Sequence, residues 1–152
     1  MGQLALYNFE KTEKMVGSGI STEEAPMKDG LAPGQSYEKT HSTTPEMGIK
    51  HLGPGVPSVL STPAMIGLME GTCVEFLTPY MSEGEQTVGF HVDVRHMAPT
   101  VIGRTLTVKV TLQEIKDTRF RFAVEAVNEQ GVKIGEGIHR RAVIKTKQFT
   151  GD

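Results

Sequence analysis

The chain has 152 residues, 38% of them hydrophobic, which suits a single domain with a substantial core. Its formal net charge is −2 and its basic residues are scattered, which argues against nucleic-acid binding. No apolar run approaches the roughly 18–20 residues that cross a bilayer, and no secretory signal pattern opens the chain. We therefore expect a cytoplasmic protein without nucleic-acid or membrane partners, with the lone Cys73 as a reduced packing residue.

Residues 1–26 show no sustained hydrophobic period and end in a polar, turn-rich stretch. We expect them to form a loosely attached extension with a short helix near residues 4–15, and residues 27–152 to form the folded domain. A strand is expected within residues 35–44. The Gly and Pro content of "HLGPGVPSVLS" (51–61) predicts a loop that leads into the next element.

The stretch after this loop has the pattern of a helix. Ser61 or Thr62 can cap the first turn, and Pro63 suits it because its missing N–H costs nothing there. Apolar and small residues then recur at steps of three and four: Met65, Leu68, Met69, Thr72, Cys73, Phe76 and Leu77. Pro79 limits the helix. Because these residues occupy most sides of the helix, we expect it to be central in the domain.

After the helix the hydrophobic period changes to two, which is typical of strands. In residues 87–96, one face is expected to carry Val88, Phe90, Val92 and Val94, and the other Gly89, His91, Asp93 and Arg95. Residues 105–115 and 119–127 also alternate, and residues 132–149 indicate a long strand with glycine breaks. The turns "KDT" and "NEQG" predict antiparallel hairpins. The expected class is α+β, with a curved antiparallel sheet wrapped around one long central helix.

Two polar residues interrupt these patterns. Glu70 lies in a helix with little solvent face, where a carboxylate is costly unless it is paired, hydrogen-bonded or neutral. A structural carboxylate and a catalytic one are both open interpretations. His96 continues the phase of Val92 and Val94, so it is either a solvated strand end or a general acid or base at the edge of the core.

Thr62, taken alone, is expected to be an N-cap. It lies eight residues before Glu70, about 12 Å along a helix, which is too far for a direct hydrogen bond. The two residues can join one site only if Thr62 lies on the incoming loop and folds back, or if two chains of a symmetric dimer contribute.

The sequence offers no support for a metal site or a cofactor. His91 and His96 are five residues apart on a strand, which puts them on opposite faces. His41 and His51 lie in expected loops without the spacing of a zinc site. Walker-type, dinucleotide-binding and G-x-S-x-G motifs are all missing from the sequence. We therefore expect neither a metal nor a cofactor.

Three segments carry a resemblance to a known family: "STPAMIGLMEGTCVEFLTPY" (61–80), "GFHVDVRHMAPTVIGRTLTV" (89–108) and "GEGIHRRAVI" (135–144). Together they resemble the fluoroacetyl-CoA thioesterase family of hotdog-fold proteins, over about residues 27–149. The resemblance implies a hotdog fold, in which a sheet wraps a central helix and two protomers pair edge to edge as a homodimer. It also implies an acyl-CoA substrate whose thioester is hydrolysed.

The resemblance further implies roles for five residues. The catalytic residues of the family fall on Thr62, Glu70 and His96. A glycine near the acyl site falls on Gly89, and a substrate-side arginine on Arg141. Thr62 would then act as nucleophile or orient the attacking water, Glu70 would activate the attacking group, and His96 would protonate the departing thiolate.

Substrate choice is expected to differ from that of the fluoroacetate-specific members, which carry a longer, phenylalanine-containing lid before the helix. Residues 47–61 are shorter here and contain no Phe, Tyr or Trp, which favours a broader or different short-chain acyl-CoA thioesterase. Two alternatives stay open at this point. One is a hotdog enoyl-thioester hydratase or dehydratase, and the other is a non-catalytic acyl-CoA or small-ligand binding module with a structural Glu70.

Overall fold

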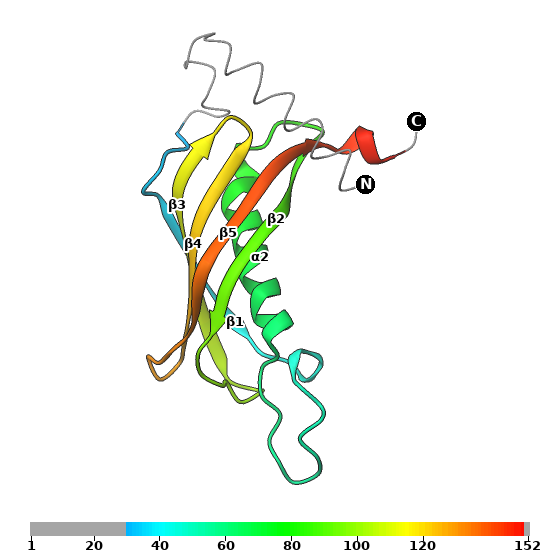
Figure 1. Ribbon diagram of the computed structural model, residues 1–152, viewed down its shortest axis with the longest axis vertical. Coiled ribbons are helices and arrows are strands. Elements are labelled where there is room, and N and C mark those ends of the chain that lie inside the picture. Colours follow the sequence, from blue (N-terminus) through cyan, green and yellow to red (C-terminus); the bar gives the residue numbers. More distant parts are fainter. Residues whose placement is uncertain (1–29, 151–152) are drawn as a thin grey trace.

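The computed structural model describes residues 30–150, which form one antiparallel five-stranded sheet and one long helix (Figure 1). The strands are β1 (Ser36–Ser42), β2 (Glu85–His96), β3 (Thr105–Lys116), β4 (Arg119–Asn128) and β5 (Lys133–Lys145), in the sheet order β1-β3-β4-β5-β2. The helix, α2, spans Thr62–Leu77 and lies against one face of the curved sheet. The predicted α+β class is confirmed. The expected extension, residues 1–26, with its short helix near residues 4–15, lies outside the described residues.

The expectation that Thr62 is the N-cap of helix α2 is wrong. The N-cap is Ser61 and not Thr62, since the Ser61 hydroxyl accepts a hydrogen bond from the Ala64 amide at 3.2 Å. Thr62 is therefore already helical. The helix passes into the short 3-10 helix η3 (Thr78–Tyr80), which contains Pro79.

The core lies between α2 and the sheet. The helix contributes Met65, Met69, Cys73, Phe76 and Leu77. The strands contribute alternate residues: Leu106, Val108, Val110 and Leu112 from β3, Phe120, Phe122, Val124 and Ala126 from β4, and Ile134 from β5. The rings of Phe76 and Phe122 meet edge to face, with their centroids 5.6 Å apart. The predicted alternation of β3 and β4 is confirmed.

The prediction for the faces of β2 is wrong in its first half. The pairing of β2 with β5 shifts by one residue between Gly89 and His91, which is a β-bulge. Gly89 therefore lies opposite Arg141 and Val92 opposite His139, and both face α2. Phe90 lies on the other face, where the Arg119 guanidinium stands 5.8 Å from the centre of its ring.

Both predicted hairpins are present, but the last strand is shorter than expected. The β3–β4 turn places Asp117 at a φ of 55°, and the β4–β5 turn places Gly131 at 82°. Strand β5 ends at Lys145, and residues 146–149 form the 3-10 helix η4 (Thr146–Phe149) instead of the predicted strand.

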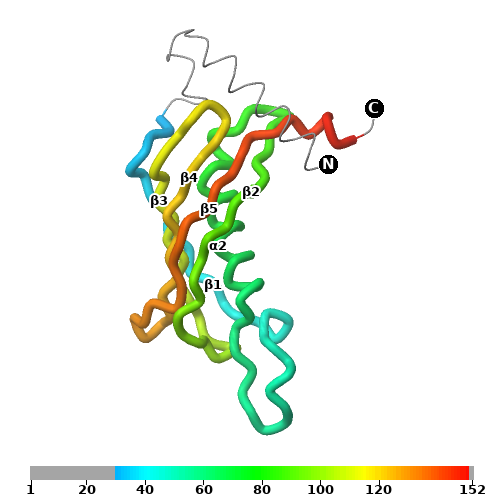
Figure 2. The backbone as a smooth tube through the Cα atoms, viewed as in Figure 1, coloured from blue at the N-terminus to red at the C-terminus, as the bar shows by residue number. Residues whose placement is uncertain are grey.

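The loop before α2 projects beyond one end of the sheet (Figure 2). It follows the 3-10 helix η2 (Pro45–Met47) and is anchored at its base, where Gly48 bridges Leu60 and Val59 bridges Val101. Within the described part of the chain, no helix is long and apolar enough to cross a membrane.

Candidate active site

Thr62 and His96 meet at the end of the molecule where α2 begins and β2 ends (Figure 1). The Thr62 hydroxyl oxygen lies 2.8 Å from Nδ1 of His96, a hydrogen-bond distance. His96 faces the helix because it lies opposite Gly135, which is packed closely against Met65. The His96 Nε2 atom is buried and has no hydrogen-bond partner among the described residues. The contact joins an alcohol to a base, which is the first requirement of an activated nucleophile.

Glu70 lies farther along the helix, beside two buried groups from β5. Its Oε2 atom is 3.6 Å from Nε2 of His139 and 3.6 Å from Nη1 of Arg141. The Glu70 side chain is 39% exposed, so the expectation of a buried carboxylate is wrong for the single chain. Gly67 and Gly71 beside it have no side chains to cover it and are also exposed, so this face of α2 is open to solvent. The carboxylate is nevertheless paired, because the guanidinium of Arg141 lies beside it. That guanidinium is itself buried.

The Arg141 guanidinium is fixed by hydrogen bonds at all three nitrogens. Nε donates to the Thr87 hydroxyl at 2.9 Å and Nη2 to the Thr87 carbonyl at 2.7 Å. Nη1 donates to Nε2 of His139 at 3.2 Å. Burial lowers the pKa of this guanidinium, which still stays charged at neutral pH because an arginine starts so high. A fixed buried cation thus faces the Glu70 carboxylate.

His139 is a site residue that the sequence analysis did not find. It is 1% exposed, and its Nδ1 lies 3.0 Å from the His91 carbonyl. Because Nε2 accepts from Arg141, the ring is neutral and its proton is assigned to Nδ1, which donates to that carbonyl. Burial lowers the pKa of His139, and the Arg141 charge acts in the same direction. The available signal was its two-residue spacing from Arg141, which puts both side chains on one face of a strand.

Gly89 allows these groups to come together. A Cβ at this position would lie 2.6 Å from Glu70 Oε2, 2.8 Å from His139 Cε1 and 3.3 Å from Arg141 Nη1. Only glycine leaves that space open. The β-bulge is what turns Gly89 toward the helix, so the structure brings Glu70, Gly89 and Arg141 into one cluster.

The five predicted residues therefore form two groups. Thr62 and His96 are one, and Glu70 with Gly89 and Arg141 is the other. Both groups lie between α2 and the sheet. Thr62 and Glu70, however, are eight helical residues apart, about 12 Å along the helix. Because Thr62 belongs to the helix itself, the incoming loop cannot fold it back toward Glu70. Within one chain the two groups are separate.

Cys73 is a residue of α2 that packs in the hydrophobic core, and its role is structural. It is a free, buried thiol, as predicted, and burial raises its pKa to about 12. A thiol with so high a pKa is not a nucleophile at neutral pH. Among residues 30–150, no group of three or more His, Cys, Asp or Glu side chains is arranged to hold a metal ion.

Comparisons with known proteins identify the family of this chain. Residues 43–147 match the family described as fluoroacetyl-CoA-specific thioesterase. The fluoroacetyl-CoA thioesterase of Streptantibioticus cattleyicolor is 36% identical over 130 residues, which cover 81% of this chain and 92% of that protein.

Solved structures point to the same family and fold. A fluoroacetyl-CoA thioesterase structure has a TM-score of 0.73 and 34% identity, covering 80% of this chain and 93% of its own. A thioesterase superfamily member from Thermus thermophilus has a TM-score of 0.71 and 28% identity, covering 80% and 89%. A hot-dog-like protein from Thermanaerovibrio acidaminovorans, at 23% identity and a TM-score of 0.69, covers 78% and 87% and supports the fold. The chain therefore belongs to the fluoroacetyl-CoA-specific thioesterase family and is a hotdog-fold thioester hydrolase.

Proposed function

We propose that this protein hydrolyses a short-chain acyl-CoA to the free acid and CoA through Thr62, Glu70 and His96. The observation that carries the proposal is the 2.8 Å contact between the Thr62 hydroxyl and Nδ1 of His96. This contact supports a role for His96 as the base that takes the proton of an attacking hydroxyl. The substrate class is supported by the curated relative, whose name is fluoroacetyl-CoA thioesterase, and by a related structure that holds fluoroacetate and CoA.

The proposed reaction breaks the thioester C–S bond and forms a C–O bond. Thr62 attacks the carbonyl carbon or holds the water that does so, and its proton passes to His96. The protonated His96 then gives a proton to the departing thiolate. If Thr62 attacks, an acyl–Thr62 ester forms; Glu70 then takes a proton from the water that hydrolyses this ester and returns it to the departing Thr62 oxygen. If water attacks directly, acid and thiol form in that single step, and the Glu70 carboxylate orients the water. Gly89 and Arg141, which lie beside Glu70, are proposed to face the substrate.

We further propose that a homodimer completes the site, with Glu70 of one chain facing Thr62 and His96 of the other. The separation of the two groups within one chain motivates this proposal. Strand β2 supports it, since it is an edge strand on which the apolar Val92 is 43% exposed. Pairing two such edges would cover both, as exposed edge strands require.

The acyl group is proposed to be short and different from, or broader than, fluoroacetyl. A cavity of about 520 Å³ lies beside the loop before α2, within the size range of ligand pockets. Its apolar lining is aliphatic: Ile49, Leu52, Val56, Val101 and Ile102. An aliphatic lining binds by shape and burial, without the aromatic lid of the fluoroacetate-specific members.

Release of free thiol from a panel of short acyl-CoAs, fluoroacetyl-CoA included, tests the activity. We expect turnover by the wild type and a fall of about 100-fold or more in Glu70→Gln. The matched control is Glu75→Gln on the same helix, whose carboxylate bonds Tyr37 and Lys39 on the outside of the molecule. No thiol release by folded wild type, or full activity in Glu70→Gln, would contradict the proposal.

Mixing two inactive variants tests the shared site. If Glu70→Gln and His96→Ala chains are co-folded, half the dimers are mixed, and each mixed dimer holds one intact site. Activity should then return to about a quarter of the wild-type value per chain. If each chain carries a complete site, the mixture stays inactive.

A further inference from the structure

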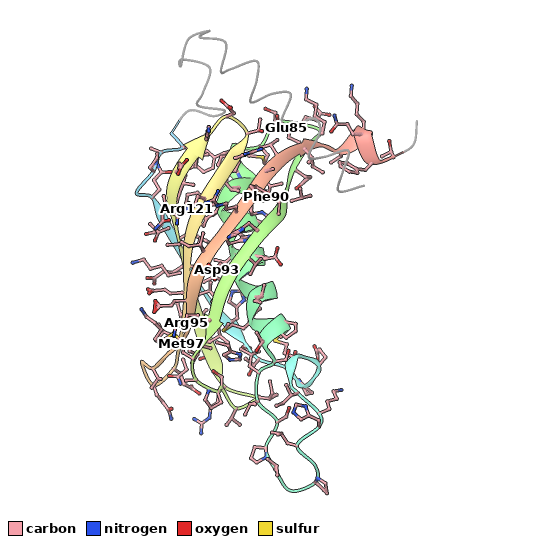
Figure 3. The ribbon with its side chains drawn as sticks, viewed as in Figure 1. Glu85, Phe90, Asp93, Arg95, Met97 and Arg121 are labelled. Atoms are coloured by element: carbon pink, nitrogen blue, oxygen red, sulfur yellow. The ribbon has the colours of Figure 1, made fainter. Side chains whose placement is uncertain are left out.

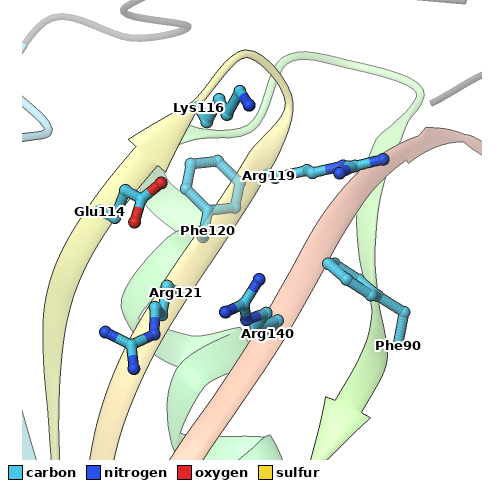
Figure 4. Close-up of a pocket in the computed structure, with 7 residues that line it drawn as sticks. All are labelled: Phe90, Glu114, Lys116, Arg119, Phe120, Arg121 and Arg140. Carbon is cyan, nitrogen blue, oxygen red and sulfur yellow. The ribbon is translucent and has the colours of Figure 1, made fainter. Parts of the chain in front are cut away.

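The face of the sheet that points away from α2 carries a cluster of cations around a shallow cavity of about 130 Å³ (Figure 4). The charged lining residues are Lys116, Arg119, Arg121, Arg140 and Glu114, four cations and one carboxylate. We call it the basic cavity. Phe90 stands at its edge, with Arg119 over its ring, and lies over the same face of the sheet as Arg121 (Figure 3). The whole chain has a formal charge of −2, so this concentration of positive charge is local.

Strand pairing brings two of these cations face to face. Arg121 of β4 lies directly opposite Arg140 of β5, and Arg140 lies opposite His91 of β2. Like charges at directly opposed positions destabilise a sheet. The one carboxylate in the row, Glu114, lies on the far side of Arg121 and forms no ion pair with it. An anion bound between Arg121 and Arg140 would therefore relieve the repulsion between them.

Arg121 also has an unused donor. Its Nη1 atom donates to Gln113 at 2.9 Å, but its Nε atom is buried and has no hydrogen-bond partner among the described residues. A buried N–H without an acceptor is costly. An anion seated between Arg121 and Arg140 would accept from this donor and neutralise the opposed charges.

We propose that the basic cavity binds a phosphoryl anion between Arg121 and Arg140. Two guanidinium groups from neighbouring strands offer paired donors that match phosphate oxygens. The cavity is small beside the roughly 300–1,000 Å³ of ordinary ligand pockets, so it suits one phosphoryl group and not a whole nucleotide.

Two sources can supply this group, a free phosphate ion or a phosphate of CoA. Arg140 and Phe90 are the chain neighbours of Arg141 and Gly89, so the basic cavity lies on the opposite face of the sheet from the Glu70 cluster. The CoA source rests on the proposed thioesterase function, whereas binding of free phosphate does not.

A titration with inorganic phosphate tests the site itself. NMR signals of the arginine Nε–H groups would be followed in the wild type and in the double variant Arg121→Gln, Arg140→Gln. We expect saturable shifts in the wild type, weakened about tenfold or more in the double variant, and no such shifts with chloride at equal ionic strength. The matched control is Arg95→Gln, which removes a cation of β2 that does not line the basic cavity. It should bind phosphate as the wild type does. Absent saturation in the wild type, or equal binding by the double variant, overturns the proposal.

Stability in the absence of phosphate shows whether the double variant is sound. Removing opposed like charges should leave its melting temperature equal to that of the wild type or higher. Phosphate should raise the melting temperature of the wild type more than that of the variant, since a ligand of the folded state stabilises it. If the double variant does not fold, Arg140→Gln alone serves for the same titration.

Thiol release then separates the two sources. If a CoA phosphate occupies the basic cavity, the double variant raises KM for acyl-CoA about tenfold and leaves acyl-pantetheine, which lacks CoA's phosphates, unchanged. If free phosphate is the occupant, both KM values stay as in the wild type while phosphate binding is lost. An equal rise of KM for both substrates would overturn assignment of the basic cavity to a CoA phosphate.

Discussion

At the scale of the residue, the Glu70 cluster shows how one buried cation is held in place. Arg141 has donors on both edges of its guanidinium, and Thr87 and His139 occupy them. Only the neutral His139 ring with its proton on Nδ1 lets Nε2 accept while Nδ1 donates. His139 lies 3.6 Å from Glu70 and accepts from Arg141, which lies equally close to Glu70, so we expect His139 to act as a positioning residue for the carboxylate.

The pKa of His139 predicts how stability depends on pH. In the folded chain this pKa lies below its ordinary value of 6.5, so between those two values the unfolded chain binds a proton that the folded chain does not. Stability should therefore be full above pH 6.5 and should fall as the pH drops below it. Melting temperatures measured from pH 7 to pH 5 should fall less for His139→Gln. A slope equal to that of the wild type would contradict this; His41, whose pKa burial also lowers, accounts for slope that remains.

Two glycines of the β2–β5 pair should respond differently to an added methyl group. In Gly89→Ala the new Cβ meets side-chain atoms of Glu70, His139 and Arg141 and no backbone, and the exposed Glu70 carboxylate can move away, so the fold should survive while Glu70 is displaced. We expect kcat/KM to fall about 10- to 100-fold with little change in melting temperature. In Gly137→Ala the Cβ would clash with the Asp93 carbonyl oxygen, which is backbone and cannot easily move, so stability should fall by about 1–3 kcal/mol. Denaturant unfolding and thiol release together check both outcomes, and loss of stability in Gly89→Ala would refute the first.

At the scale of the element, α2 is defined by its two ends and by one open face. The Ser61 side chain begins it, and the buried residues on its inner side pack against β3 and β4. Thr62 is therefore free to use its hydroxyl for His96. Had Thr62 been the cap, that hydroxyl would have been turned toward the helix amides instead.

Replacing the cap should cost stability and leave the site chemistry largely intact. Ser61→Ala removes the acceptor of the Ala64 amide, and we expect a loss of about 1 kcal/mol in the free energy of unfolding. Urea denaturation measures it, with Ser36→Ala on the exposed start of β1 as a control that should change little. An unchanged midpoint for Ser61→Ala would show that the cap contributes nothing.

At the scale of the whole molecule, the sheet ends in an edge strand that exposes apolar side chains, and the proposed site residues form two separate groups. Strand β2 ends the sheet, and beside it Met97 is 51% exposed. Thr62 and His96 lie at the N-terminal end of α2, whereas Glu70, Gly89 and Arg141 lie about two turns farther along the helix. A second copy related by a two-fold axis would answer both features at once.

The expected assembly has twice the 16.6 kDa of one chain. Light scattering during size exclusion should report that mass, and Val92→Lys, which places a charge on the apolar edge, should shift it toward the monomer and lower activity in parallel. Asp93→Lys on the opposite face of the same strand is the control and should remain a dimer. A fully active monomeric Val92→Lys would refute the shared site.

The sequence by itself determined what is local and periodic: the helical pattern of α2 and its limit near Pro79, the alternation of β3 and β4, and the tight turns of the hairpins. Each follows from neighbouring residues, so spacing alone predicts it. The β-bulge at Gly89, the exposure of Glu70 and the burial of His139 were decided only in the tertiary structure. A bulge is a property of two paired strands, and burial depends on what another element covers. For that reason a family resemblance could propose Thr62, Glu70, His96, Gly89 and Arg141 as site residues, whereas their division into two groups and the contacts of His139 became visible only once helix and sheet were packed together.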